Sequence, residues 1–330
     1  MAEATEAKPV MSEWGHRLTP SPQGVGGFDE CWYPVALSSE VPFGKVHGTP
    51  FLDGRVIVVR SPTGETSVFS AYCRHFGADL AAGDMENGCV RCPYHHWKYD
   101  MSGRCVGNDV GDRVPNDAAL FAFPTQEKWG LVWAFNGPKP TYEVPSWEED
   151  ESERYFVSHF VAEYRGDPFL VPLNVIDTQH LRSLHNLEVS DVELIADGNS
   201  FHVDMTISGD YIGLPKTTRH AQIIATNGVV YSKATIGIDT LAAGTPFGGG
   251  RSRMYIVTAG LRAAVPPEEI VERVASRARA SRDVVLQDIP IMDQMRFRVD
   301  RITKSDRGIV EFLRFAVSYP RSHTSQQFIT

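Results

Sequence analysis

The chain of 330 residues is long enough for roughly two domains, and its 42% hydrophobic residues can supply sizeable cores. Its net charge of −9 argues against nucleic acid or an anionic membrane surface as a partner. The five cysteines are an odd set that fits a reducing compartment better than a disulfide framework. We expect a cytoplasmic protein, because the N-terminus has no secretory leader pattern and no apolar run approaches the roughly 20 residues of a spanning helix.

The first part of the chain favours strands. Residues 1–27 are expected to form an irregular arm, because prolines and glycines are frequent there. The segments 55–60 and 66–70 flank a Pro-Thr-Gly turn, and 98–100 and 104–106 flank a Met-Ser-Gly turn, which predicts two hairpins. Residues 129–135 alternate as a further strand. We therefore expect a small antiparallel β domain over residues 28–140.

Two Cys-His pairs lie within this β domain. The first is Cys73 and His75, and the second is Cys92 and His95. We expect both pairs at hairpin tips near the surface. Two thiolates and two imidazoles can hold the two irons of a [2Fe-2S] cluster, and they can also close a tetrahedral zinc site. From these residues alone both kinds of site stay open.

The spacing of the two pairs resembles the Rieske pattern. Respiratory Rieske proteins carry an extra cysteine in each loop, and here those positions hold Ala78 and Tyr94, so that disulfide cannot form. The serine that bonds the cluster in those proteins is replaced by Trp97. Fewer hydrogen bonds to the sulfurs lower the reduction potential. The motif is therefore similar to the low-potential Rieske domain of an oxygenase.

The second part of the chain is expected to fold separately, over residues 141–330, after a proline-rich and acidic linker at 138–154. Strands are predicted at 201–208, 221–225, 229–239 and 253–261. The glycine-rich stretch 244–250 is expected to form a long hairpin loop. The stretch Pro266-Pro267-Glu268-Glu269 predicts the start of a helix that is expected to end at Asp288-Ile289-Pro290. A sheet around one long helix is the helix-grip (START/Bet v 1-like) architecture, so we expect the α+β class.

A second chemical motif begins at Asn174. Asp177 and His180 are three residues apart and share a helical face, whereas His180 and His185 diverge by about 140° on a regular helix. Two histidines and a carboxylate with open positions are the ligands of non-haem Fe(II) oxygenases. Bringing both histidines to one metal needs a π-bulge or a helix break between them. The alternative is two ordinary histidines on an amphipathic helix.

Together the two motifs resemble the oxygenase component (α subunit) of Rieske non-haem iron oxygenases, and the pattern is nearest to the ketosteroid 9-alpha-hydroxylase branch. The chain departs from that branch where Phe76 begins Phe-Gly-Ala-Asp in place of Leu-Gly-Ala-His, and where His96 replaces a glycine. Asp177 is implied as a bridge between an iron histidine and a cluster histidine, and Asn174 as a neighbour of the iron. For the iron carboxylate we choose Asp288 over Asp283 and Asp293. The implied ligands are Cys73, His75, Cys92 and His95 for the cluster, and His180, His185 and Asp288 for the iron.

The resemblance implies a terminal oxygenase with one Rieske [2Fe-2S] cluster and one mononuclear Fe(II) per subunit. Electrons would come from an NAD(P)H-dependent reductase, directly or through a ferredoxin, and cross between subunits of a homotrimer. The expected reaction with O₂ is hydroxylation (monooxygenation) or oxidative demethylation of a mainly apolar aromatic, alicyclic or steroid-like substrate. Two alternatives stay open: the catalytic α subunit of a cis-dihydroxylating aromatic-ring dioxygenase, and a Rieske-type electron carrier without oxygenase activity.

Basic side chains flank the two Cys-His pairs. Arg74, Arg91 and Lys98 stand beside the expected ligands on a chain that is acidic as a whole. We expect them to form a positive patch for an acidic electron donor.

Overall fold

A computed structural model gives the structure of the protein over residues 18–144, 154–198, 200–209, 214–224, 229–234, 238–261 and 266–330. Most of the expected N-terminal arm, residues 1–17, lies outside these ranges, as does the acidic run of the expected linker at 148–151. None of the helices in the described ranges is long and apolar enough to cross a membrane.

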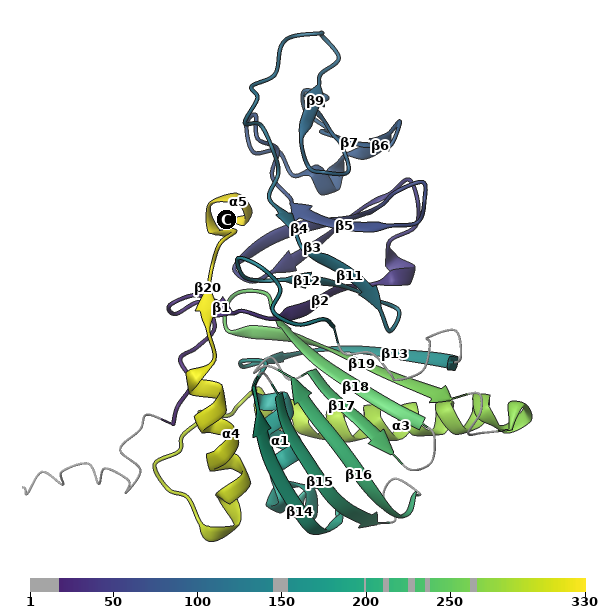
Figure 1. Ribbon diagram of the computed structural model, residues 1–330, viewed down its shortest axis with the longest axis vertical. Coiled ribbons are helices and arrows are strands. Elements are labelled where there is room, and N and C mark those ends of the chain that lie inside the picture. The colour runs from purple at the N-terminus through teal and green to yellow at the C-terminus, as the bar shows by residue number, and fades with distance from the viewer. Residues whose placement is uncertain are drawn as a thin grey trace, which may run out of the picture.

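Three small antiparallel sheets make up the N-terminal part, in the upper half of Figure 1. Their orders are β11-β12-β2, β10-β5-β4-β3 and β6-β7-β8-β9. The bounds are β2 (Trp32–Leu37), β3 (Val46–Phe51), β4 (Gly54–Arg60), β5 (Thr66–Ser70), β6 (Asp84–Glu86), β7 (Cys89–Arg91), β8 (Lys98–Tyr99), β9 (Cys105–Gly107), β10 (Ala122–Phe123), β11 (Thr125–Lys128) and β12 (Leu131–Phe135), with short 3-10 turns η1 (Ser38–Glu40) and η2 (Leu80–Ala82).

Strand β4 shows why the sequence of the N-terminal part favours strands. Its four aliphatic residues from Val56 to Val59 are fully buried, and they alternate between two different hydrophobic cores, one on each face of the sheet. An uninterrupted apolar run is what a strand covered on both faces requires. Both predicted hairpins are confirmed: β4 pairs with β5, and β8 pairs with β9, whose first residue is Cys105.

One seven-stranded antiparallel sheet dominates the C-terminal part, with the order β13-β19-β18-β17-β16-β15-β14. Helix α3 runs across one face of this sheet (Figure 1), so the α+β class and the helix-grip arrangement are confirmed. The bounds are β13 (Arg154–Arg165), α1 (Leu170–Ile176), α2 (Thr178–Ser183), β14 (Glu188–Asp197), β15 (Ser200–Gly209), β16 (Leu214–Ile224), β17 (Val229–Ala234), β18 (Ile238–Pro246), β19 (Arg251–Leu261), α3 (Pro267–Met292), η5 (Lys304–Asp306) and α4 (Arg307–Ser318).

A glycine sets the distance between α3 and the sheet. Ile270 and Val274, in the first half of α3, are fully buried against Ile238 of β18. A Cβ added at Gly260 of β19 would lie 2.7 Å from Cγ2 of Val274 and 2.8 Å from Cδ1 of Ile270. The bare backbone at Gly260 therefore lets the helix approach, and this contact positions everything that α3 carries.

Three strand predictions were wrong in their bounds. The strand expected at 221–225 is the end of β16, which begins at Leu214. The strand expected at 129–135 begins only at Leu131, because Trp129 and Gly130 have φ values of 64° and 67° and form the turn after β11. The strand expected at 229–239 is instead two strands, β17 and β18, and residues 235–237 between them lie outside the described residues.

The predictions for the long loop and the helix end were also wrong. The segment 244–250 is not a long loop, because β18 continues to Pro246 and β19 begins at Arg251. Helix α3 does not end at Asp288–Pro290 but continues through Pro290 to Met292. Met292 is 2% exposed and Ile289 packs on the same core, and this burial outweighs the one hydrogen bond that a proline near the helix end removes.

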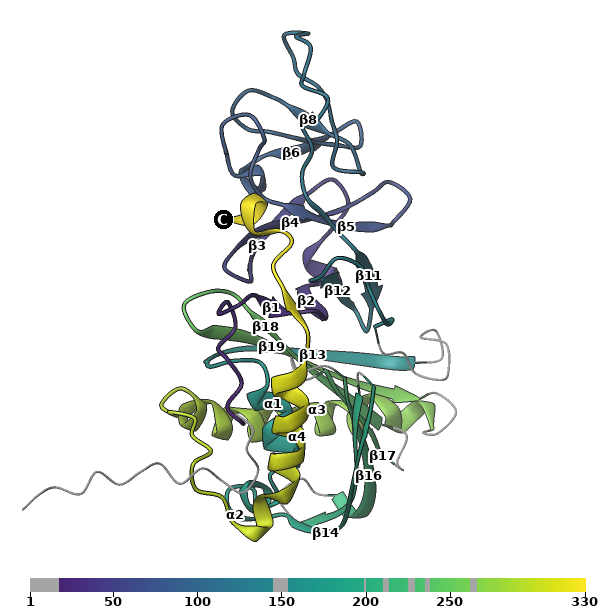
Figure 2. The same ribbon diagram turned by 60° about the vertical axis from the view of Figure 1, so that its left-hand side comes forward.

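After α4 the chain returns to the N-terminal part (Figure 2). Strand β20 (Arg321–Ser322) pairs with β1 (Phe28–Asp29), and Nε of Arg321 lies 2.9 Å from Oδ1 of the buried Asp29. The short helix α5 (Gln326–Ile329) follows, and its Ile329 is fully buried in the core next to β4. The C-terminal segment thus fastens the two parts of the molecule together.

Candidate metal centres

The two Cys-His pairs lie in neighbouring loops at one end of the molecule, beside the β6–β9 sheet. The pair Cys92–His95 occupies the tip of the hairpin β7–β8, as expected. The pair Cys73–His75 lies in a loop that the isolated antiparallel bridge between Tyr72 and Asp79 closes, and not between two strands of one sheet. It follows β5 in the loop that leads to η2 and β6, because the chain leaves one sheet here and enters the next.

The two loops have the same backbone hydrogen bonds. In each, the cysteine N–H donates to the carbonyl five residues ahead, at 2.9 Å from Cys73 and 2.8 Å from Cys92. The amide four residues ahead donates back to the cysteine carbonyl, at 2.9 and 3.2 Å. This fourth residue has a positive φ in both loops: 76° at Gly77 and 52° at His96. The glycine expected at position 96 is therefore a conformational requirement, which His96 meets with Nδ1 held 2.6 Å from Oδ2 of Asp109.

The pairs bring thiols and imidazoles together at the base of the loops. Cys73 and Cys92 are 4% and 1% exposed, and burial raises the pKa of the Cys73 thiol. The rings of His75 and His95 are 4.7 Å apart, and the buried Nδ1 of His75 has no hydrogen-bond partner in the described structure. An orphaned imidazole nitrogen beside two buried thiols fits a cluster that takes two sulfur and two nitrogen ligands.

Three aromatic or hydroxyl side chains hold these groups in place. The His75 ring is stacked between Phe76, at 3.9 Å, and Trp97, at 4.6 Å with a 5° interplanar angle. The Tyr99 hydroxyl lies 3.1 Å from Sγ of Cys73 and accepts a hydrogen bond from the Arg74 amide at 2.9 Å. Sequence reasoning missed Tyr99, although it lies only two residues beyond Trp97.

The predicted positive patch near the cluster loops is contradicted at two of its three residues, Arg91 and Lys98. The third, Arg74, is exposed and lies over the Phe328 ring. Arg91 is paired with Asp84 at 2.6 Å and with Glu86 at 2.9 Å. Lys98 lies 2.6 Å from Glu86 and 2.8 Å from Asp109. Asp84 and Glu86 of the neighbouring strand β6, and Asp109 in the loop after β9, lie directly beside Arg91 and Lys98, so the charges of these two residues are locally neutralised.

The second site begins where α1 stops. Helix α1 ends at Ile176, and Asp177 starts α2 as its N-cap, accepting hydrogen bonds from the amides of Gln179 and His180 at 3.0 and 2.9 Å. Helix α2 ends at Ser183, so His185 lies in the turn beyond it. The helix break expected between His180 and His185 is present, and it allows both imidazoles to face the same point.

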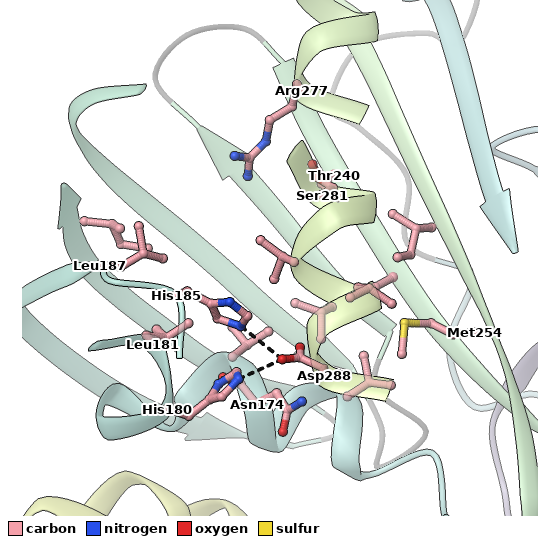
Figure 3. A pocket seen from close by; sticks show the side chains of 18 residues that line it. Asn174, His180, Leu181, His185, Leu187, Thr240, Met254, Arg277, Ser281 and Asp288 are labelled. Atoms are coloured by element: carbon pink, nitrogen blue, oxygen red, sulfur yellow. Dashed lines mark hydrogen bonds and ion pairs between the residues drawn. The ribbon is translucent and has the colours of Figure 1, made fainter. Parts of the chain in front are cut away.

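That point is Asp288 of α3. Nε2 of His180 and Nε2 of His185 each lie 3.0 Å from Oδ1 of Asp288 (Figure 3). The donor atoms of the three residues all lie within 4.8 Å of one another. His185 is 0% exposed and Asp288 is 6% exposed. Two imidazoles and one carboxylate that converge from one side fit the facial donor set of a mononuclear iron.

The other two acids considered for this role lie elsewhere. Asp283 is exposed and lies 3.7 Å from the guanidinium of Arg282. Asp293 accepts a hydrogen bond from the Arg165 amide at 2.6 Å. Only Asp288 of these three stands on the face of α3 that meets the two histidines.

The two imidazoles have opposite electrostatic environments. Burial lowers the pKa of His185. Burial also opposes charge on His180, but the hydrogen bond and charge of Asp288 outweigh it and raise the pKa of His180. Nδ1 of His180 lies 3.0 Å from the Asn174 carbonyl, which fixes the ring so that Nε2 faces Asp288. A metal-binding imidazole is commonly oriented in this way through its other nitrogen.

Asp177 and Asn174 differ in part from what the resemblance implied. Asp177 contacts the His180 amide and not its ring, and it therefore acts as the helix cap within this chain. The Asn174 side chain lines the cavity beside the triad, and its Nδ2 lies 3.7 Å from Sδ of Met292. Asn174 thus combines two features, a backbone carbonyl that orients His180 and a side chain next to the triad.

A cavity of about 130 Å³ opens beside the triad between α1, α2, α3 and the sheet. Most of its walls are aliphatic, including Val171, Leu181 and Ile256. Three polar residues that sequence reasoning missed, Arg277, Ser281 and Thr240, line the part of the cavity away from the triad (Figure 3). A signal for two of them was present, because 277, 281 and 288 fall on one face of a regular helix.

Comparison with known proteins identifies the first site. The family model of the Rieske [2Fe-2S] domain matches residues 31–118. This range contains both Cys-His loops. Residues 31–118 are a Rieske [2Fe-2S] domain. The zinc alternative is therefore set aside for this site.

Several oxygenases are similar to parts of the chain. Aminopyrrolnitrin oxygenase PrnD of Pseudomonas fluorescens is 34% identical over 174 residues, which are 49% of this chain and 47% of that protein. The oxygenase component of 3-ketosteroid-9-alpha-monooxygenase from Rhodococcus rhodochrous is 32% identical over 128 residues, which are 39% of this chain and 34% of that protein. The chain thus spans about half or less of the length of these curated relatives.

The structural similarity to solved oxygenases extends beyond the Rieske domain. Dicamba monooxygenase bound to dicamba superposes with a TM-score of 0.66 at 20% identity, over 88% of this chain and 97% of that one. This chain therefore has the two-part fold of that oxygenase, a Rieske domain followed by a helix-grip part.

Proposed function

We propose that the chain is a terminal oxygenase, which uses O₂ and electrons delivered to its Rieske cluster to oxidise an organic substrate at a mononuclear iron. One observation carries this proposal: the chain that contains the Rieske domain also contains the buried triad of His180, His185 and Asp288 beside an apolar cavity. A simple electron carrier has no use for a second metal site that opens into a cavity, and this weighs against that alternative.

In this proposal Cys73 and Cys92 hold one iron of the [2Fe-2S] cluster, and His75 and His95 hold the other. The adjacent thiols and the orphaned Nδ1 of His75 support this assignment. His95 is exposed, which puts the histidine side of the cluster within reach of a partner subunit or an electron donor.

His180, His185 and Asp288 would hold Fe(II), which when bound supplies the activation of O₂. The protein's own tasks are geometric. Asn174 fixes the His180 ring, the helix break turns His185 inward, and the aliphatic walls limit water around the reacting carbon.

The two sites lie in different halves of the molecule in Figure 1, the cluster loops beside β6–β9 in the upper half and the triad beside α1 and α3 in the lower half. We therefore infer that electrons pass between subunits, in a head-to-tail homotrimer. Asp177 is half-buried, and its Oδ2 has no hydrogen-bond partner among the described residues. That oxygen is available to the neighbouring subunit's cluster histidine, which would supply one contact of the proposed bridge, while within this chain Asp177 contacts the His180 amide.

The proposed reaction is monooxygenation or oxidative demethylation, in the cytoplasm, with electrons from an NAD(P)H-dependent reductase, directly or through a ferredoxin. A cis-dihydroxylating dioxygenase would use the same triad, so the product must decide between them. The boundary between the Rieske domain (28–140) and the catalytic domain (141–330) belongs to the same proposal.

The deciding experiment counts the irons. Protein purified without oxygen should hold about three irons per chain and give a Rieske-type EPR signal after reduction. Asp288→Ala should lose about one iron and keep the signal, whereas the matched control Asp283→Ala, on the exposed face of α3, should keep all of them. Two irons in the wild type, or an unchanged count in Asp288→Ala, would contradict the proposal.

A further inference from the structure

The cavity beside the triad has two polar ends joined by one face of α3. Arg277 and Asp288 are eleven residues apart, which is three turns of helix, about 16 Å of rise and a difference of only about 20° in direction. Ser281 and Val285 stand between them on the same face, and all four line the cavity. Arg277 therefore points into the same space as Asp288, from the opposite end (Figure 3).

The Arg277 side chain lacks a counter-charge in the described structure. Its Nε is buried without a hydrogen-bond partner, and no carboxylate among the described residues pairs with its guanidinium. Burial lowers the pKa of Arg277, and no charge among the described residues opposes this shift. The outward-facing arginines of α3 are different: Arg273 lies 2.6 Å from Glu269, and Arg279 lies 2.7 Å from Glu272.

A second orphaned group lies at the same end of the cavity. Thr240 of β18 is 8% exposed, and its Oγ1 has no hydrogen-bond partner in the described ranges. The Ser281 hydroxyl lines the same end, one turn along α3 from Arg277. Buried polar groups are normally satisfied, and a buried charge is normally paired. A guanidinium and a hydroxyl without partners among the described residues, both lining the end of the cavity away from the triad, indicate a place for an external acceptor.

We propose that Arg277, with Thr240 and Ser281, binds the carboxylate of the substrate and so holds the opposite end of that substrate at the triad. This inference rests on the proposed oxygenase function, and it narrows the substrate to a small aromatic or alicyclic carboxylic acid. The cavity of about 130 Å³ is close to the roughly 150 Å³ that accommodates one benzene ring.

The chemistry of the guanidinium fits this role. Its planar fork of N–H donors matches the two oxygens of a carboxylate, and it stays charged when buried. Anchoring the acid at one end fixes which carbon of the substrate faces His180, His185 and Asp288. An amide of the same shape lacks the charge, so the anchor should discriminate strongly between an acid and its amide.

The test measures binding by calorimetry, without oxygen, to the iron-loaded full chain. The probes are benzoate, phenylacetate and 3-phenylpropanoate, each compared with its own amide. In the wild type at least one acid should bind ten times or more tightly than its amide. Arg277→Met should lose this preference while amide binding changes less than twofold, and Arg277→Lys should keep part of it. The matched control Arg279→Met should behave as the wild type.

The unfolding temperature of Arg277→Met distinguishes a ligand-binding role of Arg277 from a purely structural one. A half-buried charge without a counter-ion among the described residues costs free energy, so Arg277→Met without ligand should unfold at the same temperature as the wild type or a few degrees higher. A large loss of stability in Arg277→Met would overturn the proposal, because it would mean that Arg277 holds the fold together.

Two binding results would also overturn the proposal: a wild type that binds none of the acids more tightly than its amide, or an acid preference that survives Arg277→Met. Iron counts on the same samples separate this inference from the proposed function. Acid binding through Arg277 in a chain that holds only two irons would contradict the proposed oxygenase function and still support the proposed carboxylate site. Three irons without any preference for an acid over its amide would support the oxygenase function and contradict the carboxylate site.

Discussion

The two metal centres of this chain are built in different ways. The cluster centre lies within residues 73–95, where two loops with the same backbone hydrogen bonds each fold back on their own cysteine. The triad joins residues 108 positions apart, His180 beside one helix break and Asp288 on a long helix. The first centre is defined by local loop geometry, whereas the second exists only while α3 keeps its place on the sheet. The difference predicts that damage to one should spare the other.

The largest expected effect comes from the cluster ligands. Cys92→Ser should abolish the cluster, and with it the visible absorption and the Rieske-type EPR signal, because a serine oxygen is a poor replacement for a thiolate. About one iron per chain should remain at the triad. Cys89→Ser, a half-buried cysteine at the start of β7, is the control and should keep all the iron. Loss of the triad iron in Cys92→Ser would contradict the independence of the two centres.

A matched pair of glycine substitutions separates the centres through packing. Gly260→Ala pushes a Cβ into Val274 and Ile270 of α3 and should cost about 1–3 kcal/mol of stability. It should weaken iron binding at the triad but not at the cluster. Gly83→Ala places its Cβ against the Arg91 carbonyl, one residue before Cys92. It should weaken iron binding at the cluster but not at the triad. Metal content and thermal unfolding of both variants would test this, and equal loss at both centres would count against it.

A smaller effect should arise from one hydroxyl. Tyr99→Phe removes a hydrogen bond to Sγ of Cys73, which is worth about 1 kcal/mol, or roughly 40 mV for one electron. The reduction potential of the cluster should fall by about that amount, because hydrogen bonds to the sulfurs favour the reduced state. Redox titration followed by EPR measures the shift. An unchanged potential would mean that the Tyr99 hydroxyl does not face the sulfur in the assembled cluster.

The smallest effect concerns Gly77 and His96, the residues with a positive φ in the two cluster loops. His96→Gly relieves a left-handed conformation but gives up the contact with Asp109, so its stability should stay within about 0.5 kcal/mol of the wild type. Gly77→Ala only introduces strain and should cost about 1 kcal/mol. Chemical denaturation measures both changes. A His96→Gly variant that is destabilised more than Gly77→Ala would show that the Asp109 contact dominates that loop.

The cluster centre could be predicted from sequence because its chemistry lies in adjacent residues with a fixed spacing. The triad could be predicted only in part. A helix break between His180 and His185 followed from their spacing, but Asp288 was selected as a helix-end residue, whereas α3 continues to Met292. What selects Asp288 is the face of α3 that it occupies, and this depends on the packing around Gly260.

Long-range pairing limited the remaining predictions. The charges of Arg91 and Lys98 were visible in the sequence, but their neutralisation depends on strand register, which places Asp84 opposite Arg91. Arg277 lies on the same helical face as Asp288, yet nothing local indicates that this face borders a cavity or that Arg277 has no counter-charge among the described residues. In both cases the sequence shows a residue and its charge, while the partner is set by tertiary structure.

The return of the chain through β20 and α5 has a consequence for how the molecule comes apart. The polypeptide passes between its two parts twice, once between β12 and β13 and again between α4 and β20. The second passage is secured by the Arg321–Asp29 ion pair and by the burial of Ile329. A protease cut in the first passage would therefore leave a nicked protein that still migrates as one particle. Its halves should separate only under denaturing conditions.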